Sequence, residues 1–330
     1  MVAAPDKLRG TATAQQAAEA ISGAAFDSWW DCDAVPVADG GEGTLDALGG
    51  ANRESVVTGP LGDPVRAAWR HGRTAVIEMA RASGLQLVGG PEGNDPVAAT
   101  TMGTGELIGA ALDAGAKRIV VGVGGSATTD GGLGALRALE PLARLRSVEL
   151  LVACDVRTTF VDAATVFAEQ KGATPSQVEL LRRRLERLAQ VYEHDYGIDV
   201  RAIEGSGAAG GLAGGLACAG ATLVSGFDLV ADELDLHETI EGADLVVTAE
   251  GFLDEQSFDG KVVGGVYDIA RADDIPVLAV VGEVVDGVRL PDGLTVISLV
   301  ERFGPDRARS HTLTCIREAV KSHLDRISGY

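Results

Sequence analysis

Two carboxylates stand among three glycines in the stretch Asp39-Gly40-Gly41-Glu42-Gly43, which closes an apolar run and precedes a helical pattern. Glycine allows the backbone to take positive φ angles or to approach a ligand closely. Carboxylates at such a junction could hold a metal ion, accept a proton or cap the helix that follows. A purely structural turn uses the same residue types. The stretch by itself therefore leaves all of these roles open.

Further carboxylates and glycines follow apolar runs that are typical of buried strands. Ligands of open α/β sheets bind beyond the carboxyl ends of the strands. Side chains at these positions would therefore converge at one edge of a parallel sheet, together with Asp39. The residues at or just after the predicted strand ends are Gly124, Gly125, Ser126, Asp130, Asp155, Glu250, Gly251, Asp254 and Lys261.

Strand and helix patterns alternate along most of the chain, which predicts an α/β fold with a largely parallel sheet. The run 33–38 contains Pro36 and is typical of an edge strand. Residues 175–192 carry an apolar stripe at helical spacing, and a capping-box pattern at Thr13 predicts a helix that begins there. The other predicted strands are 74–79, 118–123, 148–154, 244–249, 276–281 and 294–300, and the other predicted helices are 106–114 and 311–327.

Length and composition narrow the class of protein. A chain of 330 residues is long for one core and favours two domains. A net charge of −20 disfavours nucleic acid and anionic membranes as partners. The charge-free run 205–227 is rich in glycine, which favours a loop and a buried helix over a membrane span. Scattered cysteines and histidines form no zinc motif, and these features together predict a cytoplasmic protein.

The glycine-rich turn after the run 118–123 has two interpretations. Gly122, Gly124 and Ala127 match the G-x-G-x-x-A pattern of dinucleotide-binding turns, which would indicate an NAD-dependent oxidoreductase. The acidic residue that should follow about 20 positions later is missing after a second strand, and this favours a phosphate-binding turn of another kind. Carboxylates, glycine turns and a few cations such as Arg9 and Lys261 then indicate Mg²⁺-dependent phosphoryl transfer.

Several stretches together resemble the bacterial glycerate kinase family of the glycerate 2-kinase type. The resemblance spans nearly the whole chain and implies two α/β domains with a cleft between them. It implies a flavodoxin-like domain over 74–260, inserted into a second domain made of 1–73 and 261–330. The matching stretches include APDKLRGTATA, PVADGGEGT, TGPLGDPV, VIEMARASGL, GVGGSATTDGGLGAL, VACDV, GSGAAGGLAGGL and ADLVVTAEGFLDEQSFDGKVVGGV.

The activity that the resemblance implies is phosphorylation of glycerate to 2- or 3-phosphoglycerate, with ATP and Mg²⁺ as cofactors. Asp39 is then the first choice for activating the acceptor hydroxyl, and Glu42 lies in the same active-site loop. Arg9 and Lys261 would bind the substrate carboxylate or stabilise charge on the transferring group. The other implied roles are ATP binding by Gly124, Gly125, Ser126, Asp130 and Gly251, and Mg²⁺ binding by Asp155, Glu250 and Asp254.

The chain departs from the family pattern at a few places. Phe252 stands where an arginine is usual, and the segment between Leu139 and Val148 is shorter than in family members. These departures leave two alternatives open. The chain could be a weakened paralogue that binds a small acid or a nucleotide, or a kinase of another small hydroxy acid. Its oligomeric state could be a monomer or a homodimer.

Overall fold

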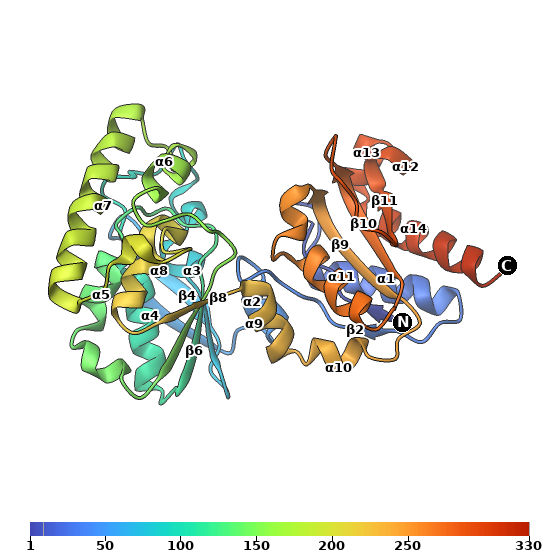
Figure 1. Ribbon diagram of the computed structural model, residues 1–330, viewed down its shortest axis with the longest axis horizontal. Helices are drawn as coiled ribbons and strands as arrows, with labels where there is room; N and C mark the ends of the chain where they lie inside the picture. Colours follow the sequence, from blue (N-terminus) through green and yellow to red (C-terminus); the bar gives the residue numbers. More distant parts are fainter. Residues whose placement is uncertain (9, 330) are drawn as a thin grey trace. The chain divides into compact units, whose positions relative to one another are not determined.

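The computed structural model describes residues 1–8 and 10–329, and within them the chain divides into two units. The terminal unit consists of residues 1–39 and 227–330, and the inserted unit consists of residues 40–226. In Figure 1 the terminal unit carries the blue and the orange-to-red ends of the colour scale. Both units contain a parallel sheet with helices packed on it, which confirms the predicted α/β fold.

The sheet of the terminal unit has the strand order β11-β10-β9-β1-β2, and every pairing in it is parallel. Counted along this unit, the order is 2-1-3-4-5, which is the flavodoxin-like arrangement. The flavodoxin-like order thus lies in the terminal unit, whereas the resemblance had assigned it to the middle of the chain. The strands are β1 (Val2–Ala3), β2 (Asp33–Ala34), β9 (Val246–Leu253), β10 (Val277–Val284) and β11 (Leu294–Ser298).

The helices of the terminal unit cover this sheet. At the start of α1 (Ala14–Asp27), Thr13 and Gln16 form the capping box that the sequence indicated. Ile21 of α1 and Ile316 of α14 (Thr312–Ile327) belong to one buried cluster with strand residues. The remaining helices are α9 (Gly226–Glu233), α10 (Leu236–Ile240), η5 (Glu255–Phe258), α11 (Val262–Ala272), α12 (Leu299–Phe303) and α13 (Pro305–Ser310).

The inserted unit has a second parallel sheet, in the order β5-β6-β7-β8, and an antiparallel hairpin formed by β3 and β4. Its strands are β3 (Arg53–Thr58), β4 (Pro64–Trp69), β5 (Ala75–Glu78), β6 (Arg118–Gly122), β7 (Glu149–Ala153) and β8 (Thr222–Val224). Its helices are α2 (Thr44–Ala47), α3 (Ala80–Ser83), η1 (Leu85–Val88), α4 (Met102–Asp113), α5 (Leu133–Leu139), η2 (Leu142–Leu145), α6 (Ala163–Phe167), η3 (Glu169–Lys171), α7 (Pro175–Tyr196), η4 (Val200–Ala202) and α8 (Ala208–Cys218).

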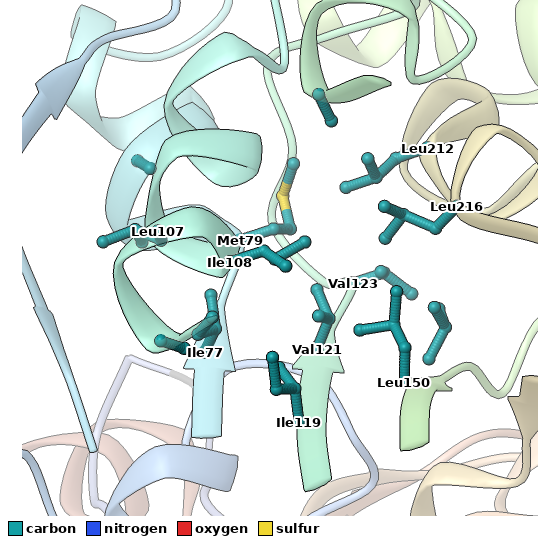
Figure 2. Close-up of a cluster of buried hydrophobic side chains, with 14 of the residues drawn as sticks. Ile77, Met79, Leu107, Ile108, Ile119, Val121, Val123, Leu150, Leu212 and Leu216 are labelled. Atoms are coloured by element: carbon teal, nitrogen blue, oxygen red, sulfur yellow. The ribbon is translucent and has the colours of Figure 1, made fainter. Parts of the chain in front are cut away.

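The core of the inserted unit lies between its sheet and two helices (Figure 2). Ile77 of β5 and Val121 of β6 meet Ile108 of α4 on one side, and Leu212 of α8 continues the same cluster. Every residue of α8 is buried, as the charge-free sequence of this segment predicted. Within the described residues, no helix is both long enough and apolar enough to span a membrane.

The unit boundaries differ from the expected division at residues 74 and 260. β9 pairs with β1 and β10, so residues 227–260 belong with the terminal strands. The β3–β4 hairpin joins the inserted unit because Thr58 donates to the Glu106 carboxylate of α4 from its backbone N–H (2.6 Å) and its hydroxyl (2.8 Å). The first and last residues of the inserted unit, Gly40 and Gly226, are neighbours, since a Cβ atom added at Gly40 would lie 2.8 Å from Cα of Gly226.

Candidate functional site

Three neighbouring segments of the terminal unit bring charged side chains to the carboxyl end of its sheet. Beyond the end of β1, the chain still pairs in parallel with the segments on both sides of it. The N–H of Asp6 donates to the carbonyl of Ala249 (2.9 Å), and the N–H of Val37 donates to the carbonyl of Pro5 (2.9 Å). Lys7 lies near two carboxylates, with its Nζ 3.5 Å from Asp6 Oδ1 and 3.6 Å from Asp39 Oδ1. The sequence prediction included Asp39, but it missed Asp6 and Lys7.

Glu250 ends the buried part of β9, on the strand next to β1. Burial raises the pKa of its carboxyl to about 7, with Asp6 and Asp254 adding to the shift and Ser257 and Lys261 opposing it. Burial also raises the pKa of Asp6 to about 6, against the attraction of Lys7. Oε1 of Glu250 is buried and has no hydrogen-bond partner in the described chain. These two carboxyls lie at the β1/β9 position, where strand order reverses in flavodoxin-like sheets.

The other predicted residues of the terminal unit follow β9. Asp254 caps η5, because its Oδ1 accepts hydrogen bonds from the N–H (3.0 Å) and hydroxyl (3.3 Å) of Ser257. Lys261 precedes α11 and acts electrostatically on Glu250, and Gly251 is the next residue of β9. Arg9, the other predicted cation, lies outside the described residues.

In the inserted unit, the loop after β6 contains the predicted phosphate-binding residues. For residues 1–8 and 10–329, no acceptor is found for the backbone N–H groups of Gly124, Gly125 and Ser126. The hydroxyl of Thr129 is buried and unpartnered as well. Consecutive backbone N–H groups of this kind form a concave site for an anion. We call residues 124–129 the glycine loop.

The glycine loop is packed against the start of α8. Ala209, Gly210 and Gly211 take left-handed backbone angles there, with φ values of 51°, 68° and 90°. A Cβ atom at Gly210 would lie 2.0 Å from the carbonyl oxygen of Thr128, so only glycine allows this approach. Left-handed alanine costs on the order of 1 kcal/mol. The fold therefore tolerates local strain in order to support the loop.

Asp130 closes the glycine loop but is occupied by protein donors. Its Oδ2 accepts from the N–H (2.9 Å) and hydroxyl (2.8 Å) of Thr101 and from the N–H of Gly134 (3.1 Å). Its Oδ1 accepts from the N–H of Gly132 (3.1 Å). A carboxylate offers about four acceptor sites. Asp130 thus ties the loop to α4 and α5.

Lys171 contacts the same loop from η3, and the sequence analysis did not single it out. Its side chain is buried, and Nζ donates to Ser126 Oγ (2.8 Å) and to the carbonyl of Thr128 (2.7 Å). Asn94 donates from Nδ2 to the carbonyls of Ala127 (3.0 Å) and Lys171 (2.9 Å). The sequence carried no local signal for this residue, because its burial follows from tertiary contacts.

Glu78 orders the segment that contains Glu42. Its buried carboxylate accepts from the N–H groups of Gly43 (2.8 Å) and Leu45 (2.9 Å) and from Arg81 Nε (3.0 Å). Glu42 itself is exposed. Asp155, at the end of β7, accepts at Oδ1 from the N–H of Gly226 (2.8 Å). Of the predicted carboxylates, Glu42, Asp130 and Asp155 belong to the inserted unit, and Asp39, Glu250 and Asp254 belong to the terminal unit.

A divalent cation fits the terminal unit best at Glu250. Over the described residues, no three His, Cys, Asp or Glu side chains converge as a preformed metal cage. Mg²⁺ is usually held by one or two carboxylates together with phosphate oxygens and water, without such a cage. The unpartnered Oε1 of Glu250, beside Asp6, meets that requirement.

Parallel α/β units with acidic strand ends and a glycine loop define a class of phosphate-handling enzymes. Comparison with known proteins names the family within this class. The model of the Glycerate kinase family matches residues 1–142 and 140–323. A glycerate kinase from Bacillus subtilis (strain 168) is 43% identical over 326 residues, covering 86% of this chain and 85% of that protein. A glycerate 2-kinase from Escherichia coli (strain K12) is 39% identical over 331 residues, covering 87% and 86%.

A solved structure agrees with these relatives. The crystal structure of a protein assigned as glycerate kinase 2 from Salmonella typhimurium LT2 superposes with a TM-score of 0.85 at 36% identity, covering 99% of this chain and 98% of that one. The chain belongs to the glycerate kinase family. It is therefore a phosphotransferase of the glycerate kinase type.

Proposed function

We propose that this chain transfers the γ-phosphoryl group of ATP to a hydroxyl group of glycerate in the presence of Mg²⁺. The observation that carries the proposal is the set of carboxylates and one lysine at neighbouring strand ends of the terminal unit: Asp6, Lys7, Asp39 and Glu250. Phosphoryl transfer needs such groups because the protein must position the acceptor hydroxyl and offset the charge of the phosphates.

Asp39 is the proposed base for the acceptor hydroxyl. In the proposed reaction, the hydroxyl proton passes to the Asp39 carboxylate while the hydroxyl oxygen attacks the γ-phosphorus atom, and ADP leaves. The ammonium group of Lys7 lies 3.6 Å from Asp39 Oδ1 and forms an ion pair with that carboxylate. Lys261 and Arg9 remain candidates for contact with the carboxylate of glycerate.

Glu250, with Asp6 beside it, is the proposed principal ligand for Mg²⁺. The bound ion would neutralise charge on the phosphates and orient them. Both carboxyls hold protons more tightly than ordinary acids because they are buried, so loading a cation would release protons from them. Asp254 and Asp155 stay secondary candidates, since each already accepts a protein hydrogen bond.

The glycine loop of the inserted unit is proposed to bind the phosphates of ATP through the N–H groups of Gly124, Gly125 and Ser126. The unpartnered hydroxyl of Thr129 supports this proposal, because a buried polar group without a partner is costly unless a ligand satisfies it. Asp130 is proposed to hold the loop in place and not to contact the nucleotide. Gly251 stays a candidate for close approach of the nucleotide to β9.

The test is release of ADP from Mg·ATP with and without D-glycerate, followed by phosphorus NMR of the product. Glycerate-dependent release is the expected result, and the spectrum would distinguish 2-phosphoglycerate from 3-phosphoglycerate. Clean binding of Mg·ATP without any turnover of glycerate would overturn the proposed substrate. A panel of other small hydroxy acids would then show whether the chain phosphorylates one of them.

A further inference from the structure

The buried lysine beside the glycine loop has no role in the reaction described so far. Lys171 lies on η3 and is 4% exposed. Fully buried lysines are rare, because removing an ammonium group from water is costly unless it is paired. A lysine in this position therefore needs an explanation beyond the packing of η3.

We propose that Lys171 is a positioning residue that fixes the glycine loop in its phosphate-binding shape and places a buried positive charge beside it. The inference rests on the proposed binding of ATP phosphates by that loop. Two of the three ammonium N–H groups are bonded to the loop, one to Ser126 Oγ (2.8 Å) and one to the carbonyl of Thr128 (2.7 Å). The third has no acceptor in residues 1–8 and 10–329, and a bound anion could supply one.

Residues on both sides of the glycine loop form hydrogen bonds that hold it in one conformation. Asn94 bonds to the carbonyls of Ala127 and Lys171 itself, so one amide links both segments. From the other side, the N–H of Ala127 donates to the carbonyl of Ser83 (2.9 Å). Ser126, Ala127 and Thr128 are thus held through their oxygens by side chains, and the N–H groups of Gly124, Gly125 and Ser126 have no acceptor within the described residues.

The charge of Lys171 depends on pH near neutrality. Burial lowers the pKa of its ammonium group to about 7, and the attraction of Asp130 acts in the opposite direction. Asp130 is the charged group that faces it from the loop, while Glu92 and Glu169 on the neighbouring segments are exposed to solvent. A phosphate that binds beside the ammonium would favour its charged form. Nucleotide binding should therefore take up a proton and weaken as the pH rises through 7.

The experiment is calorimetric titration of the full chain with Mg·ADP, which binds without turnover, from pH 6 to pH 9. The dissociation constant of the wild type, divided by that of Lys171→Met at the same pH, should rise by about ten-fold over this range, which corresponds to a shift of about one pKa unit on binding. Lys171→Met should bind about ten-fold more weakly at pH 6, in line with the loss of a charged hydrogen bond. Its dissociation constant should follow only the titration of the nucleotide and of the proposed cation-binding carboxyls, Asp6 and Glu250.

Lys117→Met is the matched control, because Lys117 is exposed and precedes β6, at the opposite end of that strand from the loop. It should reproduce the pH dependence of the wild type. Ser126→Ala covers the case in which Lys171→Met does not fold. It removes one acceptor of the ammonium group, so the midpoint of the pH dependence should move to lower pH.

The outcomes separate this inference from the proposed function. If the wild type binds Mg·ADP with the same pH dependence as Lys171→Met, or if Ser126→Ala leaves the midpoint unchanged, the role of Lys171 is overturned while the kinase reaction stands. If the wild type binds no Mg·ADP at any pH, the glycine loop is not a phosphate site, and both proposals are overturned.

Discussion

The strand ends of the two units carry opposite kinds of chemistry. In the terminal unit they bear ionisable side chains, with Lys7 between Asp6 and Asp39 and a buried Glu250 on the next strand. In the inserted unit the glycine loop offers backbone N–H groups and one buried hydroxyl. This difference indicates that the two units serve different ligands or steps. Fixed dipoles suit a ligand whose charge does not change, whereas titrating carboxylates suit proton transfer and a cation.

The largest effect on turnover should come from removing a carboxylate at the strand ends of the terminal unit. Asp39→Asn keeps the size of the side chain but removes the proposed base, and general-base catalysis contributes roughly 10²–10⁴-fold. We expect kcat to fall by about a thousand-fold while binding of Mg·ADP, measured by calorimetry, is retained. Asp31→Asn, an exposed aspartate of the same unit, is the control. Near-normal turnover by Asp39→Asn would remove the basis for the comparison.

Glu250→Gln tests how much the ionisation of Glu250 in the terminal unit lowers the free energy of unfolding. The pKa of this carboxyl is raised from 4.5 to about 7 in the folded chain, so ionisation at pH 8 opposes folding. A neutral amide should increase the free energy of unfolding at pH 8 by on the order of 2 kcal/mol. The gain should shrink as the pH falls from 7 towards 4.5, because the wild-type carboxyl is then protonated in the folded chain.

Urea unfolding of Glu250→Gln and wild type at pH 5 and pH 8 measures this gain. The exposed Glu238 provides the control, since Glu238→Gln should change the stability by less than about 0.5 kcal/mol at both pH values. An equal gain at pH 5 and pH 8 would mean that packing, and not ionisation, sets the stability of this site.

Gly125→Ala tests whether the backbone of the glycine loop in the inserted unit binds the nucleotide. Gly125 has φ +67°, and Gly115, which follows α4, has φ +88° with open space around it. Alanine at either position should cost about 1 kcal/mol of stability through left-handed strain. Only Gly125→Ala should also weaken Mg·ADP binding, by about ten-fold, since one weakened charged hydrogen bond is worth that much. Equal binding by both variants would contradict the use of this backbone by the nucleotide.

The smallest expected effect concerns Phe252, which is 57% exposed and shares a face of β9 with Glu250. Phe252→Arg would place a cation beside that carboxyl and lower its pKa. Stability at pH 8 should increase by about 0.5 kcal/mol, as for an exposed ion pair, and Phe252→Gln should lack this gain. Comparison of the two variants by thermal unfolding provides the measurement. A loss of stability in Phe252→Arg alone would contradict the expected attraction.

The sequence predicted the regular elements of the fold well, because their patterns are local. The capping box at Thr13 appears where expected, at the start of α1. The strand expected over 33–38 appears as the edge strand β2, which is shorter and covers Asp33–Ala34. The β3–β4 hairpin was missed, since its strands are half-exposed and carry charges that mask the alternation. The unit boundaries were also misplaced. They depend on the pairing of β9 with β1, whose partners lie more than 200 residues apart.

The candidate site was predictable in its residue types but not in their surroundings. Asp39 and Glu250 could be selected because they follow predicted strands. Asp6 was passed over because β1 is only two residues long, and Lys171 because nothing local distinguishes a buried lysine from an exposed one. Asp130 was selected for a ligand, although four protein donors occupy it. Such saturation follows from tertiary contacts with Thr101 and Gly134 that no local pattern encodes.

The adjacency of Gly40 and Gly226 has a consequence for how the gene for such a protein can be cut and rejoined. A segment whose two ends are neighbours can be excised, or transplanted into another host, without leaving distant ends to be bridged. Residues 40–226 therefore have the form of a cassette. Once they are removed, Asp39 and Phe227 could be joined by a short glycine linker, which would make the flavodoxin-like sheet of the terminal unit one continuous chain.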